Sequence, residues 1–465
     1  MSISLVGLAS NLDTATIINE LMKIERIPYQ KLQTQKSSLS SKQTMFRTIN
    51  TKLRALENAA ADLLLKGTYN PVKTSSSNEN AVKITGSGNG SVGTYTVAVE
   101  TLARANVLQS KAVNASDEDL KDTVFKLHYK GTTYEIKSTK TKNSEILEDI
   151  KDQINAKNTG VTASVIETVP GKKVLVLAAK ETGTANSVEW GTGSTESDTK
   201  TFFEWSAMAD TDFTTAVGAQ DAKFTVNGVE ISGRSSNTIS DVIEGVTFQL
   251  LKENETSVIT VERDYNAVAA KVEAFVNAYN DVIQTIREYT GKEAALQGNA
   301  TLRNLSSQLN SLINQALPDG FDLRHLWEVG LEVDKGVTSA SLMTGKISFD
   351  KNKFIEKLKE NPEAVMTLFL RDSEKDPGII RNFRDVLKKN WTDSIDGAIA
   401  REIAGFDASI SMLNDRMERM EYQLQLKEEQ LKKQFTAMEL ALANLQNQQM
   451  WIAAQLTSLM SISGK

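Results

Sequence analysis

The chain of 465 residues contains no cysteine, two histidines and few aromatic residues. Without cysteine it can form no disulfide, bind no metal through thiolates and use no thiol nucleophile. His128 and His325 lie far apart in the sequence, which excludes a metal site built from several neighbouring histidines. Aromatic residues make up 6% of the chain, so its cores must consist mainly of aliphatic side chains and methionine.

Blocks of basic residues and long apolar runs are also missing. The net charge of −6 and the absence of a Lys/Arg cluster argue against a nucleic-acid partner. No apolar run reaches the length of a membrane-spanning helix, so we expect no membrane insertion. The start, MSISLVGLASNLD, has neither a basic segment nor a long apolar core and is not expected to be a Sec signal peptide. The length leaves room for about three domains.

Motifs for catalysis or cofactor binding are weak. GNGSVG, residues 88–93, fits the pattern G-x-G-x-x-G, but a dinucleotide site needs a helix directly after it. The strand-like TYTVAVE follows instead, so the segment is interpreted as a turn. No pair of carboxylates suggests general acid–base chemistry. We therefore predict that the chain is not an enzyme and has no catalytic residue, cofactor or metal.

What the sequence does contain is a long amphipathic helix at its end. No Gly or Pro interrupts residues 406–463, a run of roughly 85 Å at about 1.5 Å per residue. Apolar residues recur three and four positions apart, which predicts one apolar stripe. A helix this long needs an equally long partner. The apolar residues of its N-terminal half are Ile410, Leu413, Met417, Met420 and Leu424. Those of its Gln-rich C-terminal half are Leu431, Phe435, Met438, Leu442, Leu445, Ile452, Leu456 and Leu459.

A second long helix is predicted near the start, between Pro28 and Gly67. Asp13 or Thr14 caps a shorter helix just before it. Antiparallel pairing of the two long helices is the simplest way to cover both stripes, and two unrelated surface helices are the alternative. The apolar positions of the N-terminal stripe follow a seven-residue repeat: Leu32, Leu39, Phe46, Ile49, Leu53, Leu56 and Leu63.

The middle of the chain, about 71–264, is rich in short alternating runs typical of half-buried strands. Two segments beginning at Phe125 and Phe224 each suggest strand, turn, strand, polar cap and short helix, with Ser144 and either Asn237 or Thr238 as caps. The polar tract 191–201 is interpreted as a flexible loop. Helical patterns return at Tyr265, so the β-rich part is an insertion into a helical shaft.

Several blocks of the sequence resemble the family of flagellar filament-capping proteins, also called flagellar hook-associated protein 2 or FliD. GLASNLDTATIINELMKIERIPYQKLQTQKSSLSSKQTMF, residues 7–46, is similar to the family's N-terminal signature. GTYTVAVETLARANVLQS resembles a motif of hook-associated proteins. NTISDVIEGVT, residues 237–247, is close to diagnostic, and the segment from Leu331 to Phe369 resembles the C-terminal hairpin and helix.

The resemblance implies an α+β multidomain fold. Long terminal helices form a coiled coil, and a helical leg domain follows. Two β-rich α+β head domains are inserted between the N- and C-terminal helices. The expected domains are a terminal flexible coiled-coil domain, 1–42 with 425–465; a leg, 43–70 with 265–424; a proximal head, 71–112 with 219–264; and a distal head, 113–218.

The resemblance also implies a function and partners. Members cap the distal end of the flagellum, retain exported flagellin and promote its folding and polymerisation at the tip. The chain would leave the cell unfolded by flagellar type III export and act outside the cell in motility. Its partners would be itself in a ring, expected to be a homopentamer, flagellin, and an export chaperone at the C-terminal helix. The stripe residues of the N-terminal helix, Leu32 to Leu63, and those of the first half of the C-terminal helix, Ile410 to Leu424, would make coiled-coil or oligomer contacts. The stripe residues from Leu431 to Leu459 would make filament or chaperone contacts.

Two other classes remain open from the residues alone. One is another axial flagellar component such as a junction protein, and the other is a fibrous adhesin with coiled-coil legs. Adhesion to host surface receptors, the copy number of the ring and the order of the terminal helices outside a filament are not determined by the sequence.

Overall fold

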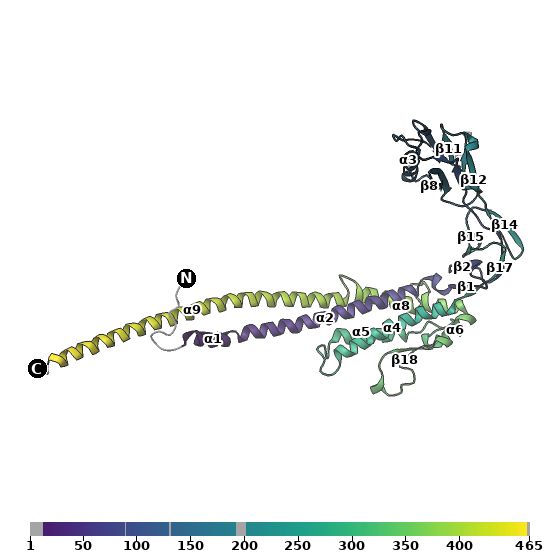
Figure 1. The fold of residues 1–465 in the computed structure, drawn as a ribbon. Coiled ribbons are helices and arrows are strands. Elements are labelled where there is room, and N and C mark those ends of the chain that lie inside the picture. The colour runs from purple at the N-terminus through teal and green to yellow at the C-terminus, as the bar shows by residue number, and fades with distance from the viewer. Residues whose placement is uncertain (1–12, 89, 130–131, 192–200, 463–465) are drawn as a thin grey trace. The chain divides into compact units, whose positions relative to one another are not determined.

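The computed structural model describes residues 13–462 except 89, 130–131 and 192–200 (Figure 1). The chain divides into two compact units. The helical unit contains both ends of the chain, up to Leu65 and from Ala269 onward, and the β-rich unit contains residues 66–268. The β-rich part is therefore an insertion between two helical parts, as the sequence pattern predicts.

The helical unit is organised around two long helices, α2 and α9. Asp13 caps α1 by accepting a hydrogen bond from the backbone N–H of Thr16, and Pro28 lies in the first turn of α2. The helices are α1 (Thr14–Glu25), α2 (Ile27–Asp62), α4 (Tyr265–Thr290), α5 (Ala300–Ile313), α6 (Lys351–Glu360), α7 (Pro362–Leu370), α8 (Ile379–Leu387) and α9 (Ala398–Ile462), with a hairpin of β18 (Leu331–Val333) and β19 (Ile347–Phe349).

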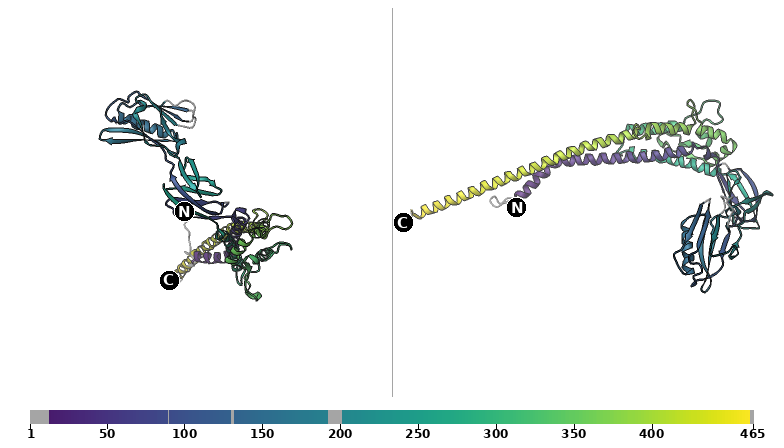
Figure 2. Two further views of the ribbon diagram at one scale, coloured as in Figure 1. Left: turned by 90° about the vertical axis from the view of Figure 1, so that its right-hand side faces the viewer. Right: turned by 90° about the horizontal axis from the view of Figure 1, so that it is seen from above.

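Helices α2 and α9 lie side by side in all three views (Figures 1 and 2). The C-terminal part of α2 also contacts α8, and α8 contacts α5. The centre of this bundle is aromatic: the rings of Phe275 and Phe383 meet edge to face, with centroids 5.4 Å apart. α9 continues through Gly405, because a helical glycine costs only about 1 kcal/mol and nothing crowds this position.

The first core of the β-rich unit lies between two antiparallel sheets. One has the strand order β1 (Val72–Ser76), β17 (Glu255–Arg263), β3 (Gly93–Thr101), β13 (Ala222–Val226) and β14 (Val229–Arg234); the other has β15 (Thr238–Ile243), β16 (Val246–Leu250) and β2 (Val82–Gly86). Phe224, Phe248 and Ile259 are fully buried between them. Inward-facing residues alternate with exposed ones along these strands, which is why the sequence pattern identified them.

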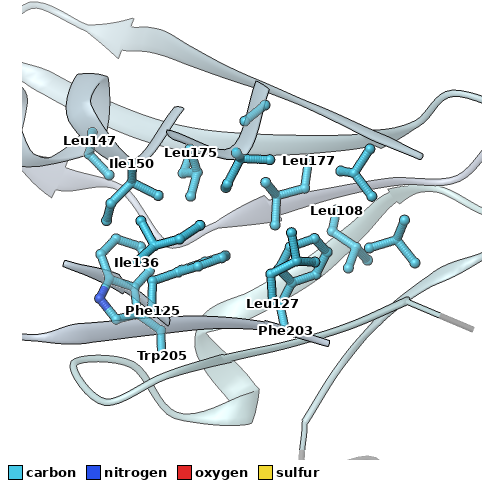
Figure 3. Packing of buried hydrophobic residues seen from close by; sticks show 14 of the residues in the cluster. Leu108, Phe125, Leu127, Ile136, Leu147, Ile150, Leu175, Leu177, Phe203 and Trp205 are labelled. Carbon is cyan, nitrogen blue, oxygen red and sulfur yellow. The ribbon is translucent and has the colours of Figure 1, made fainter. Parts of the chain in front are cut away.

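The second core of the β-rich unit packs α3 (Asn143–Ala156) with two further sheets. Phe125, Phe203 and Trp205 form its aromatic centre, and Leu147 and Ile150 of α3 point toward it (Figure 3). One sheet has the order β10 (Val188–Trp190), β11 (Thr201–Trp205), β6 (Val124–Tyr129) and β7 (Thr132–Lys137); the other has β12 (Phe213–Val217), β4 (Val107–Ser110), β9 (Lys172–Ala179) and β5 (Val113–Asn114), with β8 (Val161–Val169) also on β9.

The two cores are joined by a segment, here called the neck, that runs from Leu102 to Asn106. The Asn237 side chain accepts a hydrogen bond from Ala103 N at 2.7 Å and donates one to Ala103 O at 2.9 Å. Glu253 accepts from Leu102 N and from the Arg104 guanidinium, at 2.9 and 2.8 Å. The Leu102 amide, followed by the Arg104 charge, lowers the pKa of Glu253. Asparagine and carboxylate side chains therefore provide hydrogen-bond partners for the backbone N–H and C=O groups where the chain leaves one sheet for the next.

Several local predictions are confirmed and others are wrong. The cap at Asp13 and the return of helical structure at Tyr265 are confirmed. The helix predicted after Asn237 is wrong: residues 238–243 form β15, because this short β-branched segment pairs with β16. Asn237 holds the neck instead of capping a helix. Ser144 lies inside α3, whose N-cap is Lys142 without a side-chain hydrogen bond.

The boundary between the two heads lies elsewhere in the structure than in the sequence prediction. The sequence assigned residues up to 112 to the proximal head, but β4 pairs with β9 and β12, and Leu108 belongs to the second core. The chain thus passes from the first core to the second at the neck, earlier than expected. Of the loop predicted at 191–201, residues 192–200 lie outside the described part of the chain.

Candidate interaction surface

The α2–α9 seam combines an aromatic contact with a polar one. The rings of Phe46 and Phe406 lie 5.5 Å apart. One turn away, the amide of Gln43 donates to Asp407, and Arg47 approaches the same carboxylate at 3.7 Å. Gln43 is 9% exposed, so an unpaired amide here would cost free energy. The amide of Gln43, a polar side chain on the buried face of α2, is thus compensated by an acidic residue on the other helix.

The seam continues where α1 replaces α2 along α9. Ile18 and Met22 of α1 and Leu424 of α9 are buried in one cluster. Arg26, at the junction of α1 and α2, lies 3.8 Å from Glu421. Met420, Leu431 and Phe435 pack on the same cluster and remain partly exposed. Both N-terminal helices therefore cover one side of α9 up to about Phe435.

The predicted residues of the N-terminal stripe mostly lie within the helical unit itself. Leu39 is half-buried. The others are buried: Leu32, Phe46, Ile49, Leu53, Leu56 and Leu63. Because α2 contacts both α9 and α8, part of this stripe forms the bundle core as well as the coiled-coil seam. Contacts of these residues with other copies remain a prediction.

The predicted residues of α9 become more exposed toward its end. Leu424 is buried, whereas Ile410, Leu413, Met417, Met420, Leu431, Phe435 and Leu442 are half-buried. Four further residues are exposed: Met438, Leu445, Ile452 and Leu456. The side chain of Leu459 lies outside the described part of the structure. The last part of the stripe is thus apolar surface available to a partner.

A shallow groove of about 450 Å³ lies between α2 and α9, lined by residues 35–39 and 409–416. Leu39, Met412 and Leu413 supply its apolar walls, and Ser38, Ser409 and Arg416 its polar ones. Small serines on facing helices leave room for a side chain or another helix. The groove adds a second apolar feature to the surface of the paired helices.

A set of large residues on the opposite side of α9 was missed by the sequence analysis. Tyr422, Leu426, Leu440 and Trp451 are all exposed. Tyr422, Leu426 and Leu440 lie about 200° around the helix from the nearest seam residues, because a step of two residues turns the helix by that angle. Trp451 directly precedes Ile452 and lies about 100° from it. The four residues are 4, 14 and 11 positions apart, each close to a whole number of helical turns, and this spacing is the signal that could have revealed them. The charged residues between them obscured it.

The candidate chemical motifs have structural roles in the described chain. His128 Nδ1 lies 2.8 Å from Thr133 Oγ1, and the other ring nitrogen is 3.5 Å from Glu204. His325 and Glu328 form a capping box at a short 3₁₀ helix. Gly90 precedes β3 and Gly93 is its first residue, so the motif leads into a strand rather than a helix. Within the described residues, no group of three possible ligands could hold a metal, and no helix is long and apolar enough to span a membrane.

Comparison with known proteins now places the chain. The models for the flagellar hook-associated protein 2 N-terminus and C-terminus match residues 10–106 and 219–447, and the flagellin hook IN motif matches 125–181. The chain belongs to the flagellar hook-associated protein 2 family. It is similar over nearly its whole length to family members from Xenorhabdus nematophila, 26% identical over 96% of this chain and 98% of the relative, and from Escherichia coli strain K12, 26% identical over 98% of each.

A solved structure of the family supports the fold. The D1-D2-D3 domains of the flagellar cap protein FliD from Escherichia coli match with a TM-score of 0.62 and 25% identity, over 78% of this chain and 99% of that one. The expected α+β multidomain architecture with a long C-terminal helix is confirmed. The hook IN motif falls on the second core of the β-rich unit, from β6 to just beyond β9.

Proposed function

We propose that this chain is a structural filament cap at the distal end of the bacterial flagellum. There it retains exported flagellin and promotes its folding and polymerisation. The similarity to flagellar hook-associated protein 2 over nearly the whole chain is the observation that carries this proposal. Such a protein acts through its contact surfaces and not as an enzyme. The chain acts outside the cell, at the filament tip.

The two compact units support the proposed domains. The end of α9 with α1 and the start of α2 forms a terminal domain, and the remaining helices form a leg. The two cores of the β-rich unit correspond to a proximal and a distal head, with the neck as their boundary. The heads join copies of the chain in a ring, for which we propose five copies, and the legs reach the filament.

The exposed end of α9 supports two successive partners for the same surface. Leu445, Ile452 and Leu456 are 57, 52 and 55% exposed. An export chaperone covers this surface before export, and flagellin covers it at the filament tip. Apolar residues without charges favour contacts that form and exchange with different partners, because no fixed ion pair has to be broken.

A deletion strain tests the cap function. Loss of the gene should give short or missing filaments and flagellin in the medium, and the full-length gene should restore motility. Immunogold labelling should find the chain at filament tips alone. Long filaments without released flagellin would contradict the proposal, and labelling at the filament base would favour a junction protein.

Point variants test the role of the exposed end of α9. Replacing Leu445 and Ile452 together by Asp should abolish motility rescue while leaving the thermal unfolding of the purified chain unchanged, because both side chains are already exposed. Gln448→Asp adds the same kind of charge at an exposed position beside the stripe and is the matched control. Copurification with the chaperone should be lost in the first variant and kept in the second.

A further inference from the structure

The two hydrophobic clusters of the β-rich unit have no residue in common among the described residues. Ala103 is buried in the first core, whereas Ala105 packs against the second, so only Arg104 separates the two cores on this crossing of the chain. Arg104 itself is exposed. Two domains that are not joined by a large hydrophobic interface can move relative to each other unless other contacts hold them. The neck is therefore a candidate hinge.

Each end of the neck is fixed to one core by an asparagine. Asn237 forms two hydrogen bonds with the backbone of Ala103 on the side of the first core. Asn106 is buried and does the same in the second core, where its side chain donates to Val188 O at 2.6 Å and accepts from Val188 N at 2.8 Å. The two asparagines thus fix the neck on both sides and leave the backbone at Arg104 as the point where its direction can change.

The chain crosses back from the second core to the first beside Arg104. Arg104 N donates to Gln220 O at 2.8 Å, and Gln220 N donates to Arg104 O at 3.1 Å, which forms an isolated bridge between β12 and β13. Gly218 lies two residues before this bridge, is exposed and has nothing within 4 Å of the position of a Cβ. Two chain segments joined by a single bridge form a narrow ribbon, and few hydrogen bonds oppose its bending.

A loop of the second core reaches across this hinge and binds the first core. We call residues 182–184 the latch. The Thr182 hydroxyl donates to the carbonyl of Ser235, the residue directly after β14. The backbone N–H and the hydroxyl of Thr184 donate to the carboxylate of Asp221, directly before β13, at 2.7 and 2.6 Å. These three hydrogen bonds connect the cores at a second place beside the hinge.

The middle residue of the latch lies directly against the first core. Gly183 is buried and has a φ of 96°, a conformation that other residues rarely adopt. Its amide donates to Arg104 O at 3.1 Å. A Cβ at this position would lie 2.4 Å from both the Cα and the Cβ of Ser235. A side chain on residue 183 would therefore separate the latch from the first core.

We infer that the latch holds the two cores of the β-rich unit at one angle, and that its release lets the second core turn about Arg104 and Gly218. The hydrogen bonds to Asp221 are exposed, so water can replace them at a small cost in free energy. No latch residue belongs to either hydrophobic cluster, so release leaves both cores intact. The inference goes beyond the proposed cap function and does not depend on it, because it concerns the angle between two parts of the purified chain.

The distance between two spin labels, one on each core, tests the latch. The natural chain has no cysteine, so Lys83→Cys on β2 and Glu145→Cys on α3 place the labels at two exposed sites of the full chain. Pulsed electron paramagnetic resonance of this parent should give one narrow distribution of distances. Gly183→Ala should add a second distance, because its Cβ pushes the latch away from Ser235. Gly171→Ala is the matched control and should keep the parent distance, since Gly171 also has positive φ, 81°, and nothing lies within 4 Å of its Cβ position.

Substitutions of Asp221 test the same contact without straining the backbone. Asp221→Ala removes both acceptors and should also add a second distance. Asp221→Asn should keep the parent distance, because its amide oxygen still accepts from the Thr184 N–H and its amide nitrogen donates to the Thr184 hydroxyl. Near-ultraviolet circular dichroism should be the same for all variants, because Trp205 stays buried in an intact second core.

Three results would overturn the inference. An unchanged single distance in Gly183→Ala or in Asp221→Ala means that other contacts fix the angle between the cores. A broad distribution in the parent means that the latch does not hold them. A second distance of equal population in Gly171→Ala means that backbone strain, and not release of the latch, causes the change. Motility of the deletion strain is measured separately, so the cap function and the latch can fail independently.

Discussion

The side-chain amide of Asn237 forms two hydrogen bonds with the backbone of Ala103, although 134 positions separate the two residues. Its amide oxygen accepts from the Ala103 N–H, and its amide nitrogen donates to the Ala103 carbonyl. This pair of bonds imitates the pairing of two strands. It fixes the chain at the point where it leaves one core of the β-rich unit for the other.

Asn237→Ala should destabilise the β-rich unit. Two half-buried peptide groups of the neck lose their partners, which costs about 2 kcal/mol. Asn237→Asp keeps the acceptor but turns a carboxylate oxygen toward the Ala103 carbonyl, so it should destabilise the unit as well. Scanning calorimetry of the full chain measures both effects as a shift of the transition of this unit. Equal transitions in all three proteins would show that the neck does not depend on Asn237.

Gly245→Ala should be more harmful than Gly228→Ala. Both glycines have positive φ, 70° and 81°, so both substitutions strain the backbone by about 1 kcal/mol. A Cβ at Gly245 would also lie 2.6 Å from the backbone nitrogen of Gly90, whereas nothing lies within 4 Å at Gly228. Urea unfolding followed by circular dichroism should give a lower midpoint for the first variant. A lower midpoint for Gly228→Ala would contradict the packing at Gly245.

The neck should weaken in acid because of Glu253. Its pKa is lowered in the folded chain, first by the bond from the Leu102 amide. A lowered pKa means stabilisation that is present above the ordinary value of 4.5 and lost as pH falls through the folded value. Glu253→Gln should remove this part of the pH dependence. Melting temperatures of both proteins between pH 3 and about 6 measure it, and parallel curves would contradict it.

Leucines along the two long helices should differ in their effect on folding. Leu53 is fully buried, so Leu53→Ala should lower the free energy of unfolding by about 2–5 kcal/mol and reduce helicity. Leu445 is 57% exposed, so Leu445→Ala should change stability by less than about 0.5 kcal/mol. Circular dichroism during thermal unfolding compares the two. A large loss from Leu445→Ala would mean that the end of α9 is covered within the chain.

The long helices could be predicted because their signal is repeated over many residues. In α9 the apolar stripe recurs for more than ten turns, so single exceptions do not hide it. The segment after Asn237 is too short for such averaging, and its Ile239, Val242 and Ile243 suit a strand once β16 lies beside it. Local pattern could not provide that neighbour, which is fixed by tertiary contacts.

The interaction surface was predicted in part for the same reason. The seam follows the apolar repeat, and its outline is visible in the sequence. Gln43 is a polar residue on the buried face of α2, and its partner Asp407 is 364 positions away. The sequence pattern alone could not show that the two residues are paired. The exposed large residues on the side of α9 opposite the seam alternate with charged residues such as Glu429 and Lys433, so this side resembles an ordinary solvated face.

The unequal coverage of α9 has a consequence for how the chain opens. The helix is a single element, yet Phe406 packs against Phe46 of α2, whereas the side chain of Trp451 is exposed to solvent. Local unfolding can therefore start at the C-terminal turns and stop at Leu424 without disturbing the bundle. Amide hydrogen exchange along α9 should slow gradually from its end toward Phe406. A chain with such a gradient can loosen one end for threading through a narrow passage while the remainder stays folded.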